Sequence, residues 1–325
     1  MKAAGLIINP VSGAGADTHA AERRAALAHD VARRCGVPLE IAVTAYHGHA
    51  RALAAAFRDA EACLVVVWGG DGTVNEVASV LAGSTIPLGI VPSGSGNGLA
   101  TELRFARDPE RALDGAFRGK DRTIDAGEIN GRFFVNLAGI GFDGHVAHQF
   151  QRLSQGRRGA LPYLTIGLRS IWGYDAAMYR IELDAEAIDS RAMLLTFANS
   201  GQYGNNAVIA PLARVDDGQL DMVLVKPWPA AANFLRLHHL FRRTAHRAPG
   251  VVTRSVTCAR VSCASPMEMH VDGEIVEPAT EAVVRVLPRA LVLRVPEGRK
   301  EAGGFLLPPD SDLSTSAGTA RDSAR

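Results

Sequence analysis

Residues 63–81 read CLVVVWGGDGTVNEVASVL, an apolar run followed by a glycine-rich turn and a stretch with helical periodicity. The run at residues 63–68 has the length and β-branched content of a buried strand, and residues 74–81 are expected to form a helix. Glycines in the turn would let the backbone approach a phosphate closely, and the following helix N-terminus offers N–H groups to an anion. The stretch therefore predicts an anion-binding strand–turn–helix unit.

The same alternation of strand and helix extends over residues 1–121. Buried strands are expected at residues 5–8, 39–43, 63–68 and 87–91, and helices at residues 17–35, 49–62, 74–81 and, briefly, after the last strand. Because buried strands that alternate with helices pair in parallel, we predict an N-terminal α/β domain with a parallel sheet. Ligands of such sheets bind beyond the carboxyl ends of the strands, where the glycine-rich turns lie.

The pattern changes after Lys120 to short strands joined by turns. Asn130-Gly131, Asp217-Gly218 and Asp272-Gly273 each predict a tight turn. Strands are expected at residues 122–125, 132–137, 179–183, 192–199, 220–226, 251–256, 267–271, 282–286 and 291–295, with a broken helical stretch at residues 143–174. We predict a mostly antiparallel β domain over residues 122–300 and a disordered tail over residues 301–325.

The composition narrows the class of protein. Among the 325 residues, 35 Lys and Arg balance 34 Asp and Glu, so we expect neither a disordered chain nor a nucleic-acid partner. No apolar run approaches the ~18 residues of a membrane span, and we expect no signal peptide. The four cysteines form no CxxC and are expected to be reduced thiols. A cytoplasmic globular protein is the expectation.

Three polar, glycine-bearing loops follow three of the predicted strands. They are residues 9–13 (NPVSG), 69–73 (GGDGT) and 92–98 (PSGSGNG), and together they predict a nucleotide site. Asp71 is unusual in a phosphate-binding loop because its charge would repel the ligand. Mg²⁺ handling or proton transfer explains a carboxylate there better, and a tight turn with a helix cap is the structural alternative.

Two other nucleotide motifs are excluded. Residues 139–144 match GxGxxG, but no acidic residue ends a strand ~20 residues later and the βαβ context is missing. The sequence also contains no GxxxxGK[ST], which excludes a P-loop site.

A longer series of motifs runs through nearly the whole chain in a fixed order. They are NP-x-SG (9–13), GGDGT-x-NE (69–76), P-x-GS-x-N (92–97), D-x-G (125–127), F-x-x-N (133–136), G-x-GFD (139–143), DDG-x-LD (216–221) and VDGE (271–274). This series resembles the lipid kinase family of diacylglycerol and sphingosine kinases. GGDGT is shared with NAD kinases and phosphofructokinases, whereas the Asn-Glu after it and the second loop narrow the resemblance to lipid kinases.

The resemblance implies a NAD kinase- and diacylglycerol kinase-like α/β domain, a β-sandwich domain, and a cleft between them. It also implies Mg²⁺-dependent transfer of the ATP γ-phosphoryl group to a lipid hydroxyl. By position it implies nucleotide contacts at Asn9, Ser12, Gly13, Thr44, Gly69, Gly70, Asp71, Gly72, Thr73, Val74, Asn75, Ser95, Asn97 and Asp125.

The resemblance also implies the catalytic and metal-binding groups. Asp272 and Glu274 match the catalytic Asp-Gly-Glu of bacterial members, and a carboxylate that accepts the hydroxyl proton suits the chemistry. In sphingosine kinases the base is usually argued to be the aspartate at the position of Asp71, so the base stays open among the three. A structural Mg²⁺ is implied at the Asp217 carboxylate and the backbone carbonyls of Arg214 and Gln219, and a turn without an ion is the alternative.

The lipid itself stays open. Many bacterial diacylglycerol kinases have Asn-Asp in the second loop, whereas this chain has Asn97-Gly98, nearer the sphingosine kinase version. Diacylglycerol or a related lipid is expected, with a sphingoid base or ceramide, a soluble NAD kinase-like acceptor, or a non-catalytic sensor as alternatives. Residues 161–172 and 235–247 could touch lipid, so we expect peripheral association with a membrane surface, and a homodimer stays open.

Overall fold

The computed structural model describes residues 2–13, 19–153, 170, 174–184, 186–204, 207–229 and 238–296. The expected tail at residues 301–325 lies outside the described residues. So do all but one residue of the candidate lipid-contacting segment 161–172 and the first three residues of segment 235–247.

The N-terminal half is an α/β unit with four parallel strands, as the sequence predicts. In spatial order the strands are β4-β3-β1-β2. The elements are β1 (Ala4–Ile8), α1 (Ala20–Cys35), β2 (Leu39–Val43), α2 (His49–Asp59), β3 (Leu64–Gly69), α3 (Asp71–Leu81), β4 (Leu88–Pro92), α4 (Gly98–Glu102) and α5 (Pro109–Arg118). β1, β3 and β4 are buried along their whole length because helices cover both faces of the sheet.

Two hydrophobic clusters divide the helices between the faces of this sheet. One joins Ala28 and Val31 of α1 with Leu113 and Ala116 of α5. The other contains the buried apolar residues of α2, α3 and α4. α5 is absent from the sequence prediction. It begins at Pro109, where the Asp108 carboxylate accepts the Arg111 N–H at 3.0 Å.

The C-terminal half is built from antiparallel strands around one large apolar core. Its elements are β5 (Lys120–Ile129), β6 (Arg132–Phe134), β7 (Leu137–Gly141), α6 (Phe142–Leu153), β8 (Ala177–Leu183), β9 (Ala187–Ala192), β10 (Leu194–Ala198), β11 (Gln202–Gly204), β12 (Ala207–Val208), β13 (Leu220–Val225), α9 (His238–Phe241), a 3₁₀ turn (Ala245–Arg247), β14 (Val251–Val256), β15 (Cys258–Val271) and β16 (Glu274–Val295). The expected turn at Asn130-Gly131 is confirmed, with φ angles of 48° and 75°.

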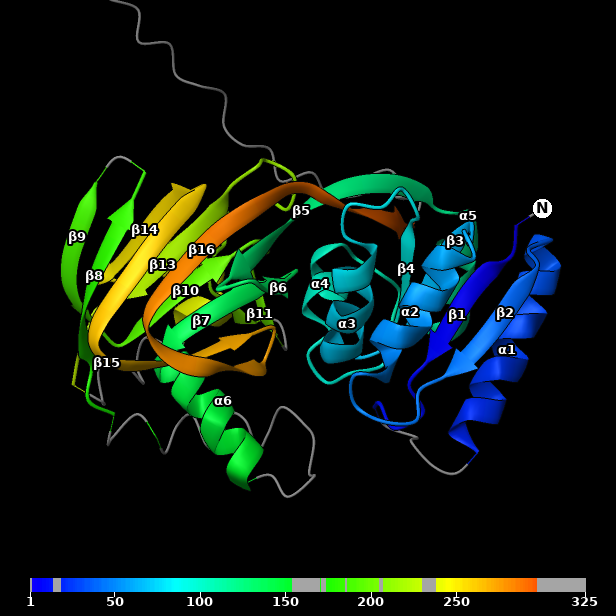
Figure 1. The fold of residues 1–325 in the computed structure, drawn as a ribbon, viewed down its shortest axis with the longest axis horizontal. Helices are drawn as coiled ribbons and strands as arrows, with labels where there is room; N and C mark the ends of the chain where they lie inside the picture. The colour runs from blue at the N-terminus through cyan, green and yellow to red at the C-terminus, as the bar shows by residue number, and fades with distance from the viewer. Residues whose placement is uncertain are drawn as a thin grey trace, which may run out of the picture.

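Two strands join the halves into one sheet. β16 leaves the β half, pairs antiparallel with β5 over residues 284–295 and ends beside β4, where Leu293 lies opposite Leu88 in parallel register (Figure 1). The expected strands at residues 282–286 and 291–295 are therefore parts of one strand. A register shift between Leu287 and Leu291 separates them.

α3 begins three residues earlier than the sequence predicts. Gly70 occupies the N-cap position and its carbonyl oxygen accepts the Val74 N–H at 3.0 Å, so Asp71, Gly72 and Thr73 form the first helical turn. Most of the GGDGT loop is thus helix, and the polar side chains of this turn take fixed directions from it.

Candidate active site

The three glycine-bearing loops meet at the carboxyl ends of β1, β3 and β4. The hydroxyl oxygens of Ser12 and Ser93 are 2.7 Å apart. A Cβ built on Gly13, whose φ is 78°, would lie 2.0 Å from the Ser93 carbonyl oxygen, and one on Gly94 would lie 2.7 Å from the Cα of Gly70. The loop backbones are therefore in direct contact, which leaves no room for side chains at these glycines.

Asp71 fastens the second loop to the first turn of α3. Its carboxylate accepts the N–H groups of Asn97 at 2.8 Å and Gly98 at 2.7 Å. A Cβ on Gly96 would lie 2.8 Å from the same carboxylate. Burial raises the pKa of Asp71, and the two N–H donors oppose that rise.

Asn97 shapes the second loop from within. It has a φ of 49°, in the left-handed region that asparagine tolerates. Its side-chain amide donates to the Gly94 carbonyl oxygen at 2.7 Å and its Oδ1 accepts the Gly94 N–H at 2.8 Å. The Asn97 side chain therefore closes a ring within the loop, so this predicted nucleotide contact has a structural use of its own.

The first loop is held by a side chain that sequence reasoning missed. Arg24 of α1 donates to the Asn9 carbonyl oxygen at 2.6 Å and to the Ser12 carbonyl oxygen at 2.8 Å, while its guanidinium lies 5.5 Å from the Trp68 ring centre. Burial lowers the pKa of Arg24. The Asn9 side chain in turn donates to the Thr73 hydroxyl at 2.8 Å, which links the first loop to α3.

The remaining predicted nucleotide contacts of this edge lie at the strand ends. Thr44 follows β2 and donates its N–H to the Ile8 carbonyl oxygen at 2.9 Å. Gly69 ends β3, and its carbonyl oxygen accepts the Ser93 N–H at 2.9 Å. Ser95 is exposed at the tip of the second loop.

Two residues of the GGDGTVNE motif face away from the predicted nucleotide position. Val74 is buried among the apolar residues of the α/β core and its N–H donates to the Gly70 carbonyl oxygen, so both groups already have partners within the protein and the nucleotide contact at Val74 stays a prediction. Asn75 is also buried, and its amide donates to Asp272 Oδ2 at 2.8 Å and to the Phe133 carbonyl oxygen at 3.1 Å. Both positions are buried because α3 is covered on most of its sides, so that every residue from Thr73 to Ala78 is buried.

Asp272 lies at the turn between β15 and β16 and is surrounded by N–H donors. Besides Asn75, the backbone N–H groups of Val135, Asn136 and Leu137 donate to its carboxylate at 2.9–3.0 Å. Burial raises the pKa of Asp272, and the four donors oppose that rise. Asp272 thus anchors the turn to the segment between β6 and β7.

Glu274 has different surroundings, although it is only two residues away. Its carboxylate oxygen lies 3.2 Å from a Cβ built on Gly72, so it reaches the first turn of α3. Among the described residues no hydrogen bond engages this carboxylate. Burial raises the pKa of Glu274, and its electrostatic interactions with His47 and Arg51 oppose that rise. A half-buried carboxylate with free lone pairs can accept a proton or ligate a cation.

One group of described side chains could hold a metal ion. One ligand atom each of His47, Glu76 and Glu274 lies within 4.8 Å of the other two. Glu76 also caps α2, because its carboxylate accepts the N–H groups of Gly48 at 3.0 Å and Ala50 at 3.1 Å. The sequence motif contains Glu76, but only the fold brings it beside Glu274.

Asp125 makes its contacts at two turns. Its carboxylate accepts the N–H groups of Gly218 and Arg289, each at 2.7 Å, and it is almost completely buried. The part predicted for Asp125 in the Mg²⁺-nucleotide network stays a prediction. The observed contacts tie β5 to the loop before β13 and to the register shift in β16.

The predicted structural metal site lies in an exposed loop. The Asp217 carboxylate accepts the Gln219 N–H at 3.1 Å, and Asp217 and Arg214 are both exposed. Burial raises the pKa of the neighbouring Asp221, and the negative charge of Asp217 adds to the rise. Two close carboxylates suit a hard cation, and occupation of this loop by Mg²⁺ stays a prediction.

Known proteins match this chain along most of its length. Residues 3–129 match the family described as diacylglycerol kinase catalytic domain, and residues 136–295 match the YegS C-terminal NAD kinase beta sandwich-like domain. A diacylglycerol kinase of Mycobacterium tuberculosis is 33% identical over 90% of this chain and 95% of its own length. This chain belongs to the diacylglycerol kinase family of lipid kinases.

A further relative and a solved structure are also similar to this chain along most of its length. A relative from Chromohalobacter salexigens, named as a YegS-like lipid kinase, is 29% identical over 82% of this chain and 86% of its own. Among solved structures, a diacylglycerol kinase from Bacillus anthracis is 20% identical, with a TM-score of 0.70 over 91% of this chain and 97% of that one. The likeness to the solved structure confirms the fold, an α/β half followed by an antiparallel β-sandwich.

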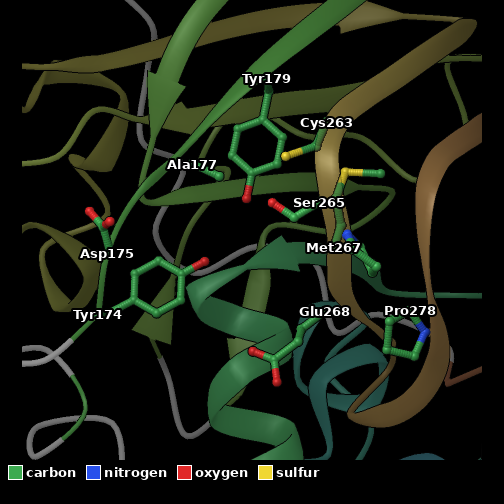
Figure 2. Close-up of a pocket in the computed structure, with 10 residues that line it drawn as sticks. Tyr174, Asp175, Ala177, Tyr179, Cys263, Ser265, Met267, Glu268 and Pro278 are labelled. Atoms are coloured by element: carbon green, nitrogen blue, oxygen red, sulfur yellow. The ribbon is translucent and has the colours of Figure 1, made fainter.

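This lipid kinase also has a cavity in its β half. The cavity has a volume of about 460 Å³ and lies between β8, β15 and the start of α6 (Figure 2). Tyr179 and Cys263 lie side by side on one wall, because β8 and β15 pair at these residues, and Glu268 lies at the α6 side, where it is 2.8 Å from His145 Nδ1. Apolar and aromatic groups make up much of the lining, including Ala177, Met267, Pro278 and the ring of Tyr174.

Proposed function

We propose that this kinase transfers the γ-phosphoryl group of Mg²⁺-bound ATP to the hydroxyl of a membrane lipid, diacylglycerol or a close relative. One observation carries the proposal. The turn that bears Asp272 and Glu274 contacts the helix that begins in the glycine loops, through Asn75 and beside Gly72. A phosphate donor at the loops and an acceptor hydroxyl at the turn would therefore be neighbours.

The loops fit a triphosphate. The first turn of α3 has N–H groups without intrahelical partners, which can donate to phosphate oxygens. The closely packed glycines carry no side chains, so the surface of the loops consists largely of backbone atoms that a phosphate can approach. Mg²⁺, when bound, would neutralise charge on the phosphates. The ligand atoms of His47 and Glu76 converge with that of Glu274 beside this turn, so His47 and Glu76 could hold a divalent cation while Glu274 stays free to take a proton.

Glu274 is the better placed of the three candidate bases. The acceptor hydroxyl oxygen would attack the γ-phosphorus while the bond to the β-phosphate oxygen breaks and ADP leaves, and the hydroxyl proton would pass to Glu274. The carboxylates of Asp71 and Asp272 already accept two and four N–H groups. We therefore assign those two to holding the loops and the turn in place.

The acceptor would approach from the β half. Asp272 follows the end of β15 and lies four residues after Glu268 at the cavity, which is about 13 Å along an extended chain. A lipid whose chain lies against the apolar part of the cavity, at Ala177, Met267 and Pro278, would span that distance to its hydroxyl. Several relatives are named diacylglycerol kinases, which favours diacylglycerol over the sphingoid base that Asn97-Gly98 keeps as an alternative.

Membrane contact is proposed at α9. Among the described helices none has the length and apolar character that a membrane crossing needs. Phe241 on α9 is 57% exposed and is followed by the exposed Arg242 and Arg243. An exposed aromatic ring beside arginines suits the surface of an anionic bilayer.

Phe241→Glu should weaken binding to phosphatidylglycerol vesicles about tenfold or more, because burying a Phe side chain is worth roughly 1.5–3 kcal/mol. Vesicle co-sedimentation measures this. Met178→Glu is the matched control, since Met178 is 61% exposed on β8. Turnover of a short-chain, water-soluble acceptor should not change in either variant. Equal vesicle binding of the two variants would rule out α9 as the contact.

Transfer of labelled phosphate from ATP into separate mixed micelles of diacylglycerol, monoacylglycerol, sphingosine and ceramide tests the proposed function. Diacylglycerol should be labelled by the wild type and only in the presence of Mg²⁺. Strongest labelling of sphingosine or ceramide would change the substrate class. If ATP binds and no lipid is labelled, the proposal fails, and labelling of NAD would then show a soluble acceptor.

A further inference from the structure

Behind the Asp272 turn lies a buried polar group that the proposed chemistry does not use. Asp143 of α6 and His270 of β15 are 1% and 3% exposed, and His270 Nε2 lies 2.7 Å from Asp143 Oδ2. The Tyr203 hydroxyl donates to the other oxygen of Asp143. The Tyr203 hydrogen bond and the close approach of the His270 ring offset part of the cost of burying the Asp143 carboxylate, although Nε2 and Oδ2 form no regular hydrogen bond.

The other nitrogen of the His270 ring reaches the turn. Its Nδ1 accepts the N–H of Gly273 at 3.2 Å, and Gly273 lies between Asp272 and Glu274. A ring nitrogen that accepts an N–H carries no proton, so the proton of a neutral ring is on Nε2, the nitrogen that lies 2.7 Å from Asp143 Oδ2. The two contacts thus define one tautomer of a neutral ring.

The fold makes space for this pair. His270 lies opposite Gly139 of β7, and a Cβ on Gly139 would come within 2.4 Å of His270 Nε2 and 2.1 Å of Asp143 Oδ2. Likewise, a Cβ on Gly144 would lie 2.2 Å from the Glu268 carbonyl oxygen, so α6 packs directly on the backbone of β15. These glycines and Asp143 belong to the GIGFDG sequence, which has no contact in the nucleotide site.

We propose that Asp143 and His270 are positioning residues that hold the backbone of the Asp272–Gly273 turn and so direct Glu274 toward α3. Asp143 fixes the His270 ring, and the ring fixes the Gly273 amide. The Asp272 carboxylate anchors the other residue of the turn through the N–H groups of residues 135–137. Both turn residues are then held, and the Glu274 side chain extends from a fixed backbone. This inference rests on the proposed catalytic part of Glu274.

Two substitutions of His270 separate its two contacts. The Asn side chain places its amide group near the position of Nδ1, so its oxygen can still accept the Gly273 N–H. The longer Gln side chain places its amide group near the position of Nε2, so it can contact Asp143 but not the Gly273 N–H. His270→Gln should lower kcat about tenfold or more with KM for ATP little changed, and His270→Asn should keep kcat within about threefold of the wild type. Both should lower the melting temperature similarly, because both disturb the buried pair. Equal kcat in the two variants would overturn the proposal.

The ring itself gives a readout that needs no substrate. Burial lowers the pKa of His270 and Asp143 raises it, and the net shift is upward, so the tautomer is best measured at mildly alkaline pH. ¹⁵N NMR of histidine-labelled protein, with His270→Asn for assignment, should show a neutral ring protonated on Nε2. A ring protonated on Nδ1 would overturn the proposal. If the wild type labels no lipid, the proposed function has failed, and the tautomer alone decides whether the ring holds the turn.

Discussion

Glu274→Gln should lower kcat at neutral pH by roughly 10²–10⁴-fold, the usual contribution of a positioned general base. Gln keeps the size of the side chain but cannot accept the hydroxyl proton. KM for ATP should change little, because the glycine loops bind the nucleotide. Steady-state kinetics with diacylglycerol micelles measures both constants. Glu277→Gln on the same strand is the control, since Glu277 is exposed, and it should behave as the wild type.

The pH profile distinguishes a base from a merely polar group. Because burial raises the pKa of Glu274, its carboxyl keeps its proton to a higher pH than an ordinary glutamate does. The base works when ionised, so wild-type kcat should fall as pH decreases through that raised pKa, above the ordinary value of 4.5. Glu274→Gln should lose this acidic limb. A limb that persists in the variant would assign the base to Asp71 or Asp272.

Gly13→Ala should raise KM for ATP about tenfold or more. The new methyl group would lie 2.0 Å from the Ser93 carbonyl oxygen, so the first and second loops would have to separate. The residue would also keep a φ of 78°, where a non-glycine residue costs roughly 1–2 kcal/mol. Nucleotide binding by calorimetry and kinetics at varied ATP measure the effect.

Gly83→Ala is the matched control for the cost of placing alanine at a positive φ. Gly83 has the same φ of 78°, but nothing lies within 4 Å of a Cβ there. Both variants should lose similar stability from the strained φ, which thermal unfolding measures. Only Gly13→Ala should lose affinity for ATP. A similar loss in Gly83→Ala would mean that general destabilisation, and not loop contact, controls nucleotide binding.

The sequence could predict the sheet edge and its loops because the signals there are local. Each loop follows an apolar strand, and glycine with Asn or Asp marks each turn. The parallel order of the strands then brings Ser12, Gly70 and Gly94 together without further information. The same logic predicts the hairpins at Asn130-Gly131 and Asp272-Gly273.

The other parts of the site depend on contacts between residues that are far apart in the chain. Asn75 and Asp272 are 197 positions apart, and neither local pattern indicates that they form a hydrogen bond. Arg24 looks like any polar residue of an amphipathic helix, although it holds the first loop. Val74 matched a motif, but its burial depends on the packing of α3 against the rest of the α/β half.

The double crossing of β5 and β16 limits how the two halves can move. A single connecting strand could twist about its own axis, whereas a hydrogen-bonded ribbon resists twisting and bends across its face. The ladder is interrupted between Leu287 and Leu291, and bulged strands bend at such points. The two halves would therefore open and close by rotation about one axis near this bulge, which the hydrogen bond from the Arg289 N–H to Asp125 holds in place. Asp272 and Glu274 would approach α3 along a single arc.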